Sequence, residues 1–174
     1  MASSPPRPSA TELTGRLQAR YGQDLPETSD ALGEAVVRVV PERYHELIAT
    51  LRDDADLAFD YLDFVTAVDW GDERGFDVVV QLWSTRHHTS LRVKVGVPAE
   101  DPSVPTISDL YPGANWHERE TWELFGIRFE GHPQLVKLLL PERFEGFPLR
   151  KDFELMSRVA KPWPGEETSE GASE

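Results

Sequence analysis

The chain has 174 residues, no cysteine and a formal net charge of −13. This length suits one domain with tails, and the negative charge argues against nucleic acid or an anionic membrane surface as a partner, because both attract basic surfaces. The absence of cysteine excludes disulfides and thiolate ligation of an iron–sulfur cluster. No apolar run approaches the roughly 20 residues that a membrane-spanning helix needs, and the first residues lack the apolar core of a signal peptide, so we expect a cytoplasmic location.

Residues 10–126 are predicted to form one α+β domain, preceded by a disordered segment over the Ser- and Pro-rich residues 1–9. Leu13 and Leu17 lie one helical turn apart in a predicted first helix, and a second helix begins at Pro41. Short connections favour hairpins, so we expect an antiparallel or mixed four-stranded sheet with helices on one face. The strands are predicted from β-branched or alternating segments at residues 34–40, 61–70, 76–84 and 90–97.

After Pro98 the pattern changes. A short helical piece is predicted over residues 107–110. A longer C-terminal helix then starts at residue 114 or 115 and ends at Phe125, because Gly126 is suited to the left-handed position that follows a helix.

Residues 127–164 are predicted to form an extended, proline-containing strap. Repeated prolines prevent long regular elements there, and residues 126–161 carry more basic than acidic groups in an otherwise acidic chain. A segment of this composition has little to bury without a second surface. We therefore expect it to bind an acidic partner and to be poorly ordered before it does so. Residues 165–174 are predicted to be an acidic, disordered tail.

Charged residues are concentrated on the C-terminal helix. The carboxylates of Glu118 and Glu120 could serve acid–base chemistry, and a small stand-alone enzyme that uses them with His132 is one hypothesis. His87 and His88 could bind a metal, but their spacing matches no recognised ligand pattern. Carboxylates on a helix more often form ion pairs, so an ion-paired docking face is the favoured interpretation.

The strap adds two proline-fixed bends and an arginine suited to recognition. Gly131-His132-Pro133 predicts a turn with a fixed exit direction. Arg150 follows the second bend and can bind a partner carboxylate through two parallel hydrogen bonds, so we expect it to be buried against one. No catalytic, cofactor-binding or metal-binding residue is predicted. The predicted partner interface comprises Glu118, Arg119, Glu120, Glu123, Gly131, His132, Pro133, Pro148, Leu149, Arg150, Lys151 and Asp152.

Several blocks of this region resemble the signature of one protein family, the 30-kDa subunit of respiratory complex I, the bacterial form of which is the NADH:quinone oxidoreductase. The form is similar to that of actinobacteria. Glu123 stands where many members have aspartate, and Val136 stands where the family often has a basic residue. The blocks are Glu-Arg-Glu-x-x-Glu-Leu-Phe-Gly-Ile at residues 118–127, Phe-x-Gly-His-Pro at 129–133, Leu-Leu-Leu-Pro at 138–141 and Pro-Leu-Arg-Lys-Asp-Phe at 148–153.

The resemblance implies a non-catalytic core subunit of the peripheral arm, on the cytoplasmic side of the cell membrane and in contact with the membrane only through the complex. It implies that the chain clasps the 49-kDa-type subunit, which forms the quinone pocket, near the subunit that holds the terminal cluster. FMN, iron–sulfur clusters and quinone are then expected in partner subunits and not in this chain. The assembled complex, not the isolated chain, is expected to transfer electrons from NADH to quinone and to translocate protons. The alternative is the equivalent scaffold of a related energy-converting hydrogenase or another quinone-linked dehydrogenase.

Overall fold

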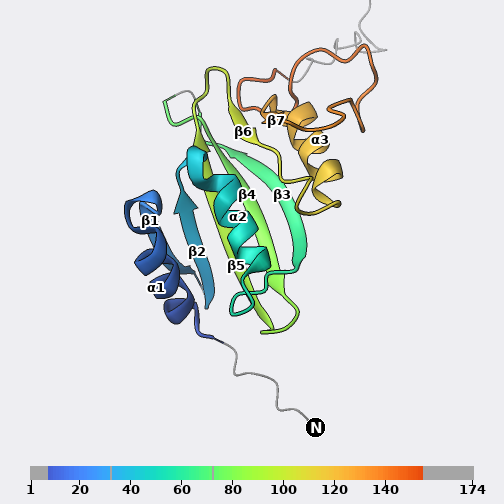
Figure 1. The fold of residues 1–174 in the computed structure, drawn as a ribbon. Helices are drawn as coiled ribbons and strands as arrows, with labels where there is room; N and C mark the ends of the chain where they lie inside the picture. Colours follow the sequence, from blue (N-terminus) through green and yellow to red (C-terminus); the bar gives the residue numbers. More distant parts are fainter. Residues whose placement is uncertain (1–7, 32, 72, 155–174) are drawn as a thin grey trace, which may run out of the picture.

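Five strands form one mixed sheet in the computed structural model, which describes residues 8–31, 33–71 and 73–154 (Figure 1). The strand order is β1–β2–β5–β4–β3, in which β2 and β5 are parallel and all other neighbours are antiparallel. This confirms the predicted α+β class with a mixed sheet. The strands are β1 (Glu27–Ala31), β2 (Glu34–Val39), β3 (Tyr61–Asp69), β4 (Phe76–Ser84) and β5 (Thr89–Val97).

Strand β1 adds a fifth strand to the four that the sequence predicts. Its sequence, Glu-Thr-Ser-Asp-Ala, has no apolar alternation, and most of its residues are exposed. It forms as the outer strand of a hairpin with β2, in which Gly33 has a φ of 83° and donates its N–H to Asp30. Turn chemistry and a strong neighbouring strand therefore produce a strand that hydrophobic patterning does not indicate.

The helices pack against one face of the sheet, as predicted (Figure 1). The core-facing residues alternate along the strands, so that Val37, Val80 and Val93 are neighbours in register and join the helix side chains in one apolar cluster. Ser9 and Glu12 form a capping box at the start of the first helix, so Ser9 is part of the helix start. The helices are α1 (Ala10–Tyr21), α2 (Tyr44–Asp53) and α3 (Ala114–Phe125), with short 3₁₀ turns η1 (Gly22–Asp24) and η2 (Pro41–Arg43).

The opposite face of the sheet carries paired charges. Arg38 donates two hydrogen bonds to Asp77, at 2.6 and 2.7 Å, and the Trp70 indole donates a third at 2.9 Å. Burial acts to raise the pKa of Asp77, but these donors outweigh it and hold the pKa of Asp77 below its usual value. A second pair joins Arg92 to Glu34 at 2.7 Å.

A small second sheet ties the start of the predicted strap to the domain. Strands β6 (Ser103–Pro105) and β7 (Arg128–Glu130) pair in parallel, and Ile127 and Phe129 are buried in the core. The strap therefore begins at Gly131, and its described part ends at Glu154. The predicted helical piece over residues 107–110 is a hydrogen-bonded turn instead.

Other predicted segments lie partly or wholly outside the described residues. These are residues 1–7 of the N-terminal segment, residues 155–164 of the strap and the tail over residues 165–174. Within the described ranges, no helix combines the length and apolar character needed to cross a membrane.

Candidate partner-docking site

Helix α3 carries the first part of the predicted site and ends at a left-handed glycine. Gly126 has a φ of 77° and donates its N–H to the Trp122 carbonyl at 2.8 Å. A Cβ at Gly126 would lie 2.7 Å from Nη2 of Arg150 and 2.7 Å from the Phe147 ring. Glycine is therefore required both by the helix end and by the close approach of the strap.

The Glu123 carboxylate holds the middle of the strap against α3. It accepts the backbone N–H groups of Leu138, Leu139 and Leu140 at 3.0, 2.8 and 2.6 Å. Burial acts to raise the pKa of Glu123, but the three N–H donors outweigh it and hold this pKa below its usual value. One side chain thus satisfies three backbone groups that an extended segment would otherwise leave unpaired.

Two cations bind carbonyl groups of the strap. Arg119 donates from Nε to the Val136 carbonyl at 3.0 Å and from Nη2 to the Lys137 carbonyl at 3.2 Å. The Lys137 ammonium in turn gathers the next bend, because its three contacts are the carbonyl oxygens of Pro141, Glu142 and Phe144, at 3.3, 3.1 and 2.8 Å.

Arg150 fixes the end of the strap between two aromatic rings. Its guanidinium lies 5.0 Å from the Phe76 ring centre and 4.6 Å from that of Phe147, and its Nε donates to the Phe125 carbonyl. Beside it, the Leu149 N–H donates to the backbone of α3. These contacts all belong to the chain itself, so the expected pairing of Arg150 with a partner carboxylate stays a prediction.

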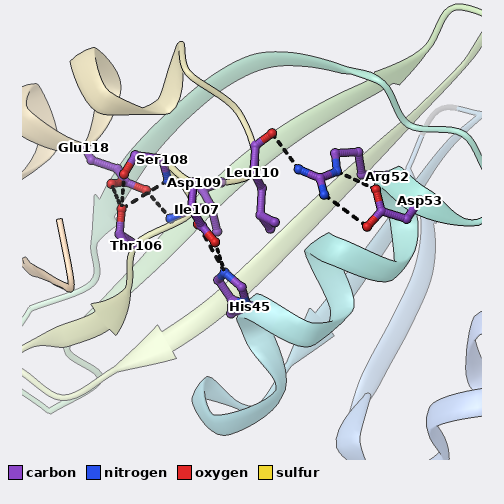
Figure 2. Close-up of polar contacts among 9 residues, drawn as sticks. All are labelled: His45, Arg52, Asp53, Thr106, Ile107, Ser108, Asp109, Leu110 and Glu118. Atoms are coloured by element: carbon purple, nitrogen blue, oxygen red, sulfur yellow. Dashed lines mark hydrogen bonds and ion pairs between the residues drawn. The ribbon is translucent and has the colours of Figure 1, made fainter. Parts of the chain in front are cut away.

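A second carboxylate, Glu118, is fully buried between α3 and the turn of residues 106–111 (Figure 2). It accepts the Thr106 hydroxyl at 2.5 Å and the Ile107 N–H at 2.7 Å. Burial raises the pKa of Glu118 to about 7, although both hydrogen bonds act to lower it.

His132 begins the strap as a neutral ring beside Glu118. The Gln134 N–H donates to Nδ1 at 3.0 Å, so Nδ1 carries no proton and Nε2–H is the donor to the Asn115 carbonyl at 3.3 Å. Nε2 also lies 3.9 Å from Oε2 of Glu118. Burial lowers the pKa of His132, which favours the same neutral form.

The structure divides the predicted interface residues by exposure. Glu118 and Glu123 are buried and bind their own chain, so they do not form the ion-paired docking face that the sequence favours. Backbone N–H groups of the turn and the strap occupy these carboxylates in place of cations. Four further residues are half-buried, namely Arg119, His132, Pro148 and Arg150, and six are exposed, namely Glu120, Gly131, Pro133, Leu149, Lys151 and Asp152.

Exposed apolar side chains on α3 and the strap are the feature that sequence reasoning largely misses. We call Trp116, Val136, Leu139, Phe147 and Leu149 the apolar docking residues. Their exposed fractions are 61%, 44%, 60%, 37% and 52%, respectively. Large exposed apolar groups in one region are typical of protein interfaces. The Leu-Leu-Leu run at residues 138–140, in a segment without helical or strand periodicity, is the signal that could have indicated them.

The same region offers little for catalysis. Glu118 and His132 are brought together, but Glu120 is exposed, so the structure does not assemble the acid–base group of the enzyme hypothesis. Across residues 8–31, 33–71 and 73–154, no three His, Cys, Asp or Glu side chains are grouped so that they could hold a metal ion, and this includes His87 and His88.

Comparison with known proteins identifies the family. The sequence profile of the family described as respiratory-chain NADH dehydrogenase, 30 Kd subunit, matches residues 37–159. The chain belongs to this family. It is 45% identical over 144 residues to the NADH-quinone oxidoreductase C subunit of Roseiflexus castenholzii, which covers 82% of this chain and 83% of that protein. The corresponding protein of Salinispora arenicola is 39% identical over 155 residues, covering 78% of this chain and 63% of that protein.

Solved structures agree with this family. The trypsin-resistant fragment (1-134) of Nqo5 is 34% identical, with a TM-score of 0.61 over 71% of this chain and 98% of that chain. A chain of the membrane-bound sulfane sulfur reductase, an archaeal respiratory membrane complex, is 24% identical with a TM-score of 0.72 over 84% of this chain and 86% of that chain, and shares the fold. The resemblance seen in the sequence is confirmed, and the chain is a subunit of a multisubunit, membrane-associated NADH-quinone oxidoreductase.

Proposed function

We propose that the chain is a non-catalytic core subunit of the peripheral arm of complex I, and that α3 and the strap clasp the 49-kDa-type subunit. The observation that carries this proposal is the exposure of the apolar docking residues on a strap that the chain itself holds in place. Because Glu123, Arg119 and Arg150 already fix the strap backbone, binding does not have to order it, and preorganisation of this kind raises affinity.

The charge around the docking residues favours an acidic partner. Arg143 and Lys151 are exposed on the strap, and Arg119 and Lys137 are half-buried beside Val136. Basic groups around an apolar contact steer a partner of opposite charge and fix its orientation. We therefore propose that the partner surface combines apolar pockets with acidic groups at their edge.

The proposal assigns the redox chemistry to partner subunits. The chain has no cysteine to bind an iron–sulfur cluster, and we expect FMN, the clusters and quinone elsewhere in the complex, with the terminal-cluster subunit nearby. The chain then lies on the cytoplasmic side and meets the membrane only through the complex. It supports electron transfer from NADH to quinone and proton translocation after assembly, and the isolated chain catalyses nothing.

A scaffold role in a related complex is the second candidate. The fold shared with a chain of the archaeal sulfane sulfur reductase favours it, since the same fold also occurs in that respiratory membrane complex. The identities of 45% and 39% to proteins named as the C subunit of NADH-quinone oxidoreductase favour the first candidate. Identification of the chains that co-purify with the native protein distinguishes an energy-converting hydrogenase or another quinone-linked dehydrogenase from complex I.

Two exposed leucines provide the test of the docking surface. The variant Leu139→Asp with Leu149→Asp changes side chains that are 60% and 52% exposed, so the isolated chain should fold normally. We expect the amount of intact complex to fall more than about tenfold, since charges in an apolar contact cost several kcal/mol, with unchanged NADH:quinone activity per assembled particle. Tyr61→Asp, on β3 and 55% exposed, is the matched control and should assemble normally.

Two results would contradict the proposal. Normal amounts of complex containing the double leucine variant would show that these residues do not contact a partner. Normal assembly with lost activity per particle would place this surface in the reaction itself and would remove the scaffold role.

A further inference from the structure

The contact between Glu118 and His132 joins the domain to the first residues of the strap. Both side chains are fully enclosed, with 0% exposure each. The Nε2–H of His132 has two acceptors close by, the Asn115 carbonyl at 3.3 Å and Oε2 of Glu118 at 3.9 Å. Its Nδ1 accepts the Gln134 N–H, so the position of this ring is coupled to the backbone of the strap.

Glu118 has no cation at hydrogen-bond distance to balance its charge within the described residues. Its partners are one hydroxyl and one backbone N–H, and the His132 ring beside it is neutral. The Tyr44 hydroxyl is also buried and makes no hydrogen bond in the same part of the chain, while burial and then the nearby Glu118 charge raise the pKa of Tyr44. With the pKa of Glu118 raised to about 7 by burial, its charged and neutral forms coexist at neutral pH.

A chain of two hydroxyl groups leads from Glu118 towards the surface. Oγ1 of Thr106 lies 2.5 Å from Oε2 of Glu118 and 2.8 Å from Oγ of Ser108, and Ser108 is half-buried (Figure 2). A hydroxyl both donates and accepts. Thr106 can therefore donate to the carboxylate, or accept from the carboxylic acid while it donates to Ser108.

We propose that Glu118 is a proton-binding switch whose charge state selects the acceptor of the His132 Nε2–H and thereby sets how the strap begins. Ionised Glu118 attracts this N–H, because a hydrogen bond to a charged acceptor is roughly twice as strong as one to a neutral acceptor. Protonated Glu118 leaves the N–H on the Asn115 carbonyl. The consequence for partner docking rests on the proposed function, whereas the switch itself is a property of the chain.

Other titratable groups around this site do not replace the Glu118–His132 pair. The Asp109 charge raises the pKa of Glu118 and His45 lowers it, but these two contact each other at 3.0 Å on an exposed surface, so their effects partly cancel (Figure 2). The Tyr111 hydroxyl donates to the Phe59 carbonyl. The groups that face Glu118 or His132 are Tyr44 and His45 from α2, Asp109 and Tyr111 from the turn of residues 106–111, and Arg119 from α3.

The test is a pH titration of the full-length chain by nuclear magnetic resonance. The Glu118 carboxyl carbon should titrate with a midpoint near 7, and the His132 Nε2 and Gln134 amide signals should follow the same midpoint. In Glu118→Gln, whose amide reproduces the shape and donor of the protonated acid, the Gln134 step should disappear. Glu120→Gln, exposed on the same helix, is the control and should keep it.

Two results would overturn the proposal. One is a Glu118 midpoint in the ordinary carboxyl range, about 4 to 5, and the other is a Gln134 step that survives in Glu118→Gln. Thr106→Val gives a measurement that does not depend on the folding of that variant. It removes a hydrogen bond that favours the charged form, so the Glu118 midpoint should rise, while Thr106→Ser should leave it in place, and an unchanged midpoint in Thr106→Val contradicts the switch. All of these readings use the isolated chain, so they remain valid whether or not the docking proposal holds.

Discussion

The guanidinium of Arg150 occupies the space that a side chain at Gly126 would need. A Cβ there would lie 2.7 Å from Nη2, well inside van der Waals contact. The end of α3 and the end of the strap are therefore built against each other, and a change at the helix end should be felt in the strap.

Gly126→Ala should release the end of the strap. The positive φ of 77° costs an alanine about 1–2 kcal/mol, and the new methyl group displaces Arg150 and the Phe147 ring. We expect the Leu149 amide, which donates to the Leu124 carbonyl, to lose at least tenfold in hydrogen-exchange protection. Gly113→Ala is the control, because that glycine has a φ of −65° and its Cβ meets nothing within 4 Å. Unchanged protection of Leu149 in Gly126→Ala would contradict this account.

Glu123→Gln should loosen the middle of the strap. An amide has one acceptor oxygen and no charge, so it cannot serve three N–H donors, and each hydrogen bond to a charged group contributes roughly 1.5–3 kcal/mol. Protection of the amides of residues 138–140 should fall at least about tenfold, equivalent to about 1.4 kcal/mol. Glu120→Gln, exposed one helical turn earlier, should change nothing at these amides.

Acidification should have the same local effect on the unmodified chain. The pKa of Glu123 in the folded chain is held below its unfolded value of about 4.3. The stabilisation is therefore complete above that unfolded pKa and is lost as the pH falls through the folded pKa. Protection factors of the amides of residues 138–140, corrected for intrinsic exchange, should decline below about pH 4 in the wild type and stay low and nearly flat in Glu123→Gln.

Hydrophobic periodicity predicts most of the fold because the core contacts follow it. Residues such as Val80 and Val93 alternate along the strands that the sequence indicates, and Leu13 and Leu17 lie on one face of α1. The short strands β1, β6 and β7 escape this reasoning. Their formation depends on a partner strand rather than on a pattern of their own.

The site is predictable in its residues but not in their contacts. The sequence singles out Glu123, yet its partners are backbone N–H groups 15 to 17 positions further along, and backbone groups leave no mark on the sequence. The expectation that the strap needs a partner to order it fails for the same reason, since Glu123 and Arg119 hold it through its own backbone. Trp116 is likewise apolar but 61% exposed, a fact set by tertiary packing.

Asp77→Asn should destabilise the chain more than the loss of any exposed ion pair. Asp77 is buried and receives two hydrogen bonds from Arg38, whose side chain is 25% exposed. Removal of one member leaves the other charge partly desolvated, and after discounting for the exposure of Arg38 we expect a loss of roughly 2–3 kcal/mol in the free energy of unfolding. Arg20→Met, which removes an exposed pair with Asp54, should cost less than about 1 kcal/mol. Urea unfolding of both variants measures the difference, and equal losses would contradict the buried-pair argument.

Glu118 should make the chain less stable as the pH rises towards neutrality. Its pKa is about 7 in the folded chain and about 4.3 in the unfolded one, so between these values the folded chain binds more protons. The free energy of unfolding must then fall as the pH rises from about 4 to 7, and the loss between pH 5 and pH 8 is on the order of 2–3 kcal/mol. Glu118→Gln cannot ionise and should be close to the wild type at pH 5 but more stable than it at pH 8. Because every other titratable group is common to both proteins, the difference between their urea-unfolding free energies at the two pH values isolates Glu118. Parallel pH profiles for the two proteins would show that the buried carboxyl is not the group that titrates.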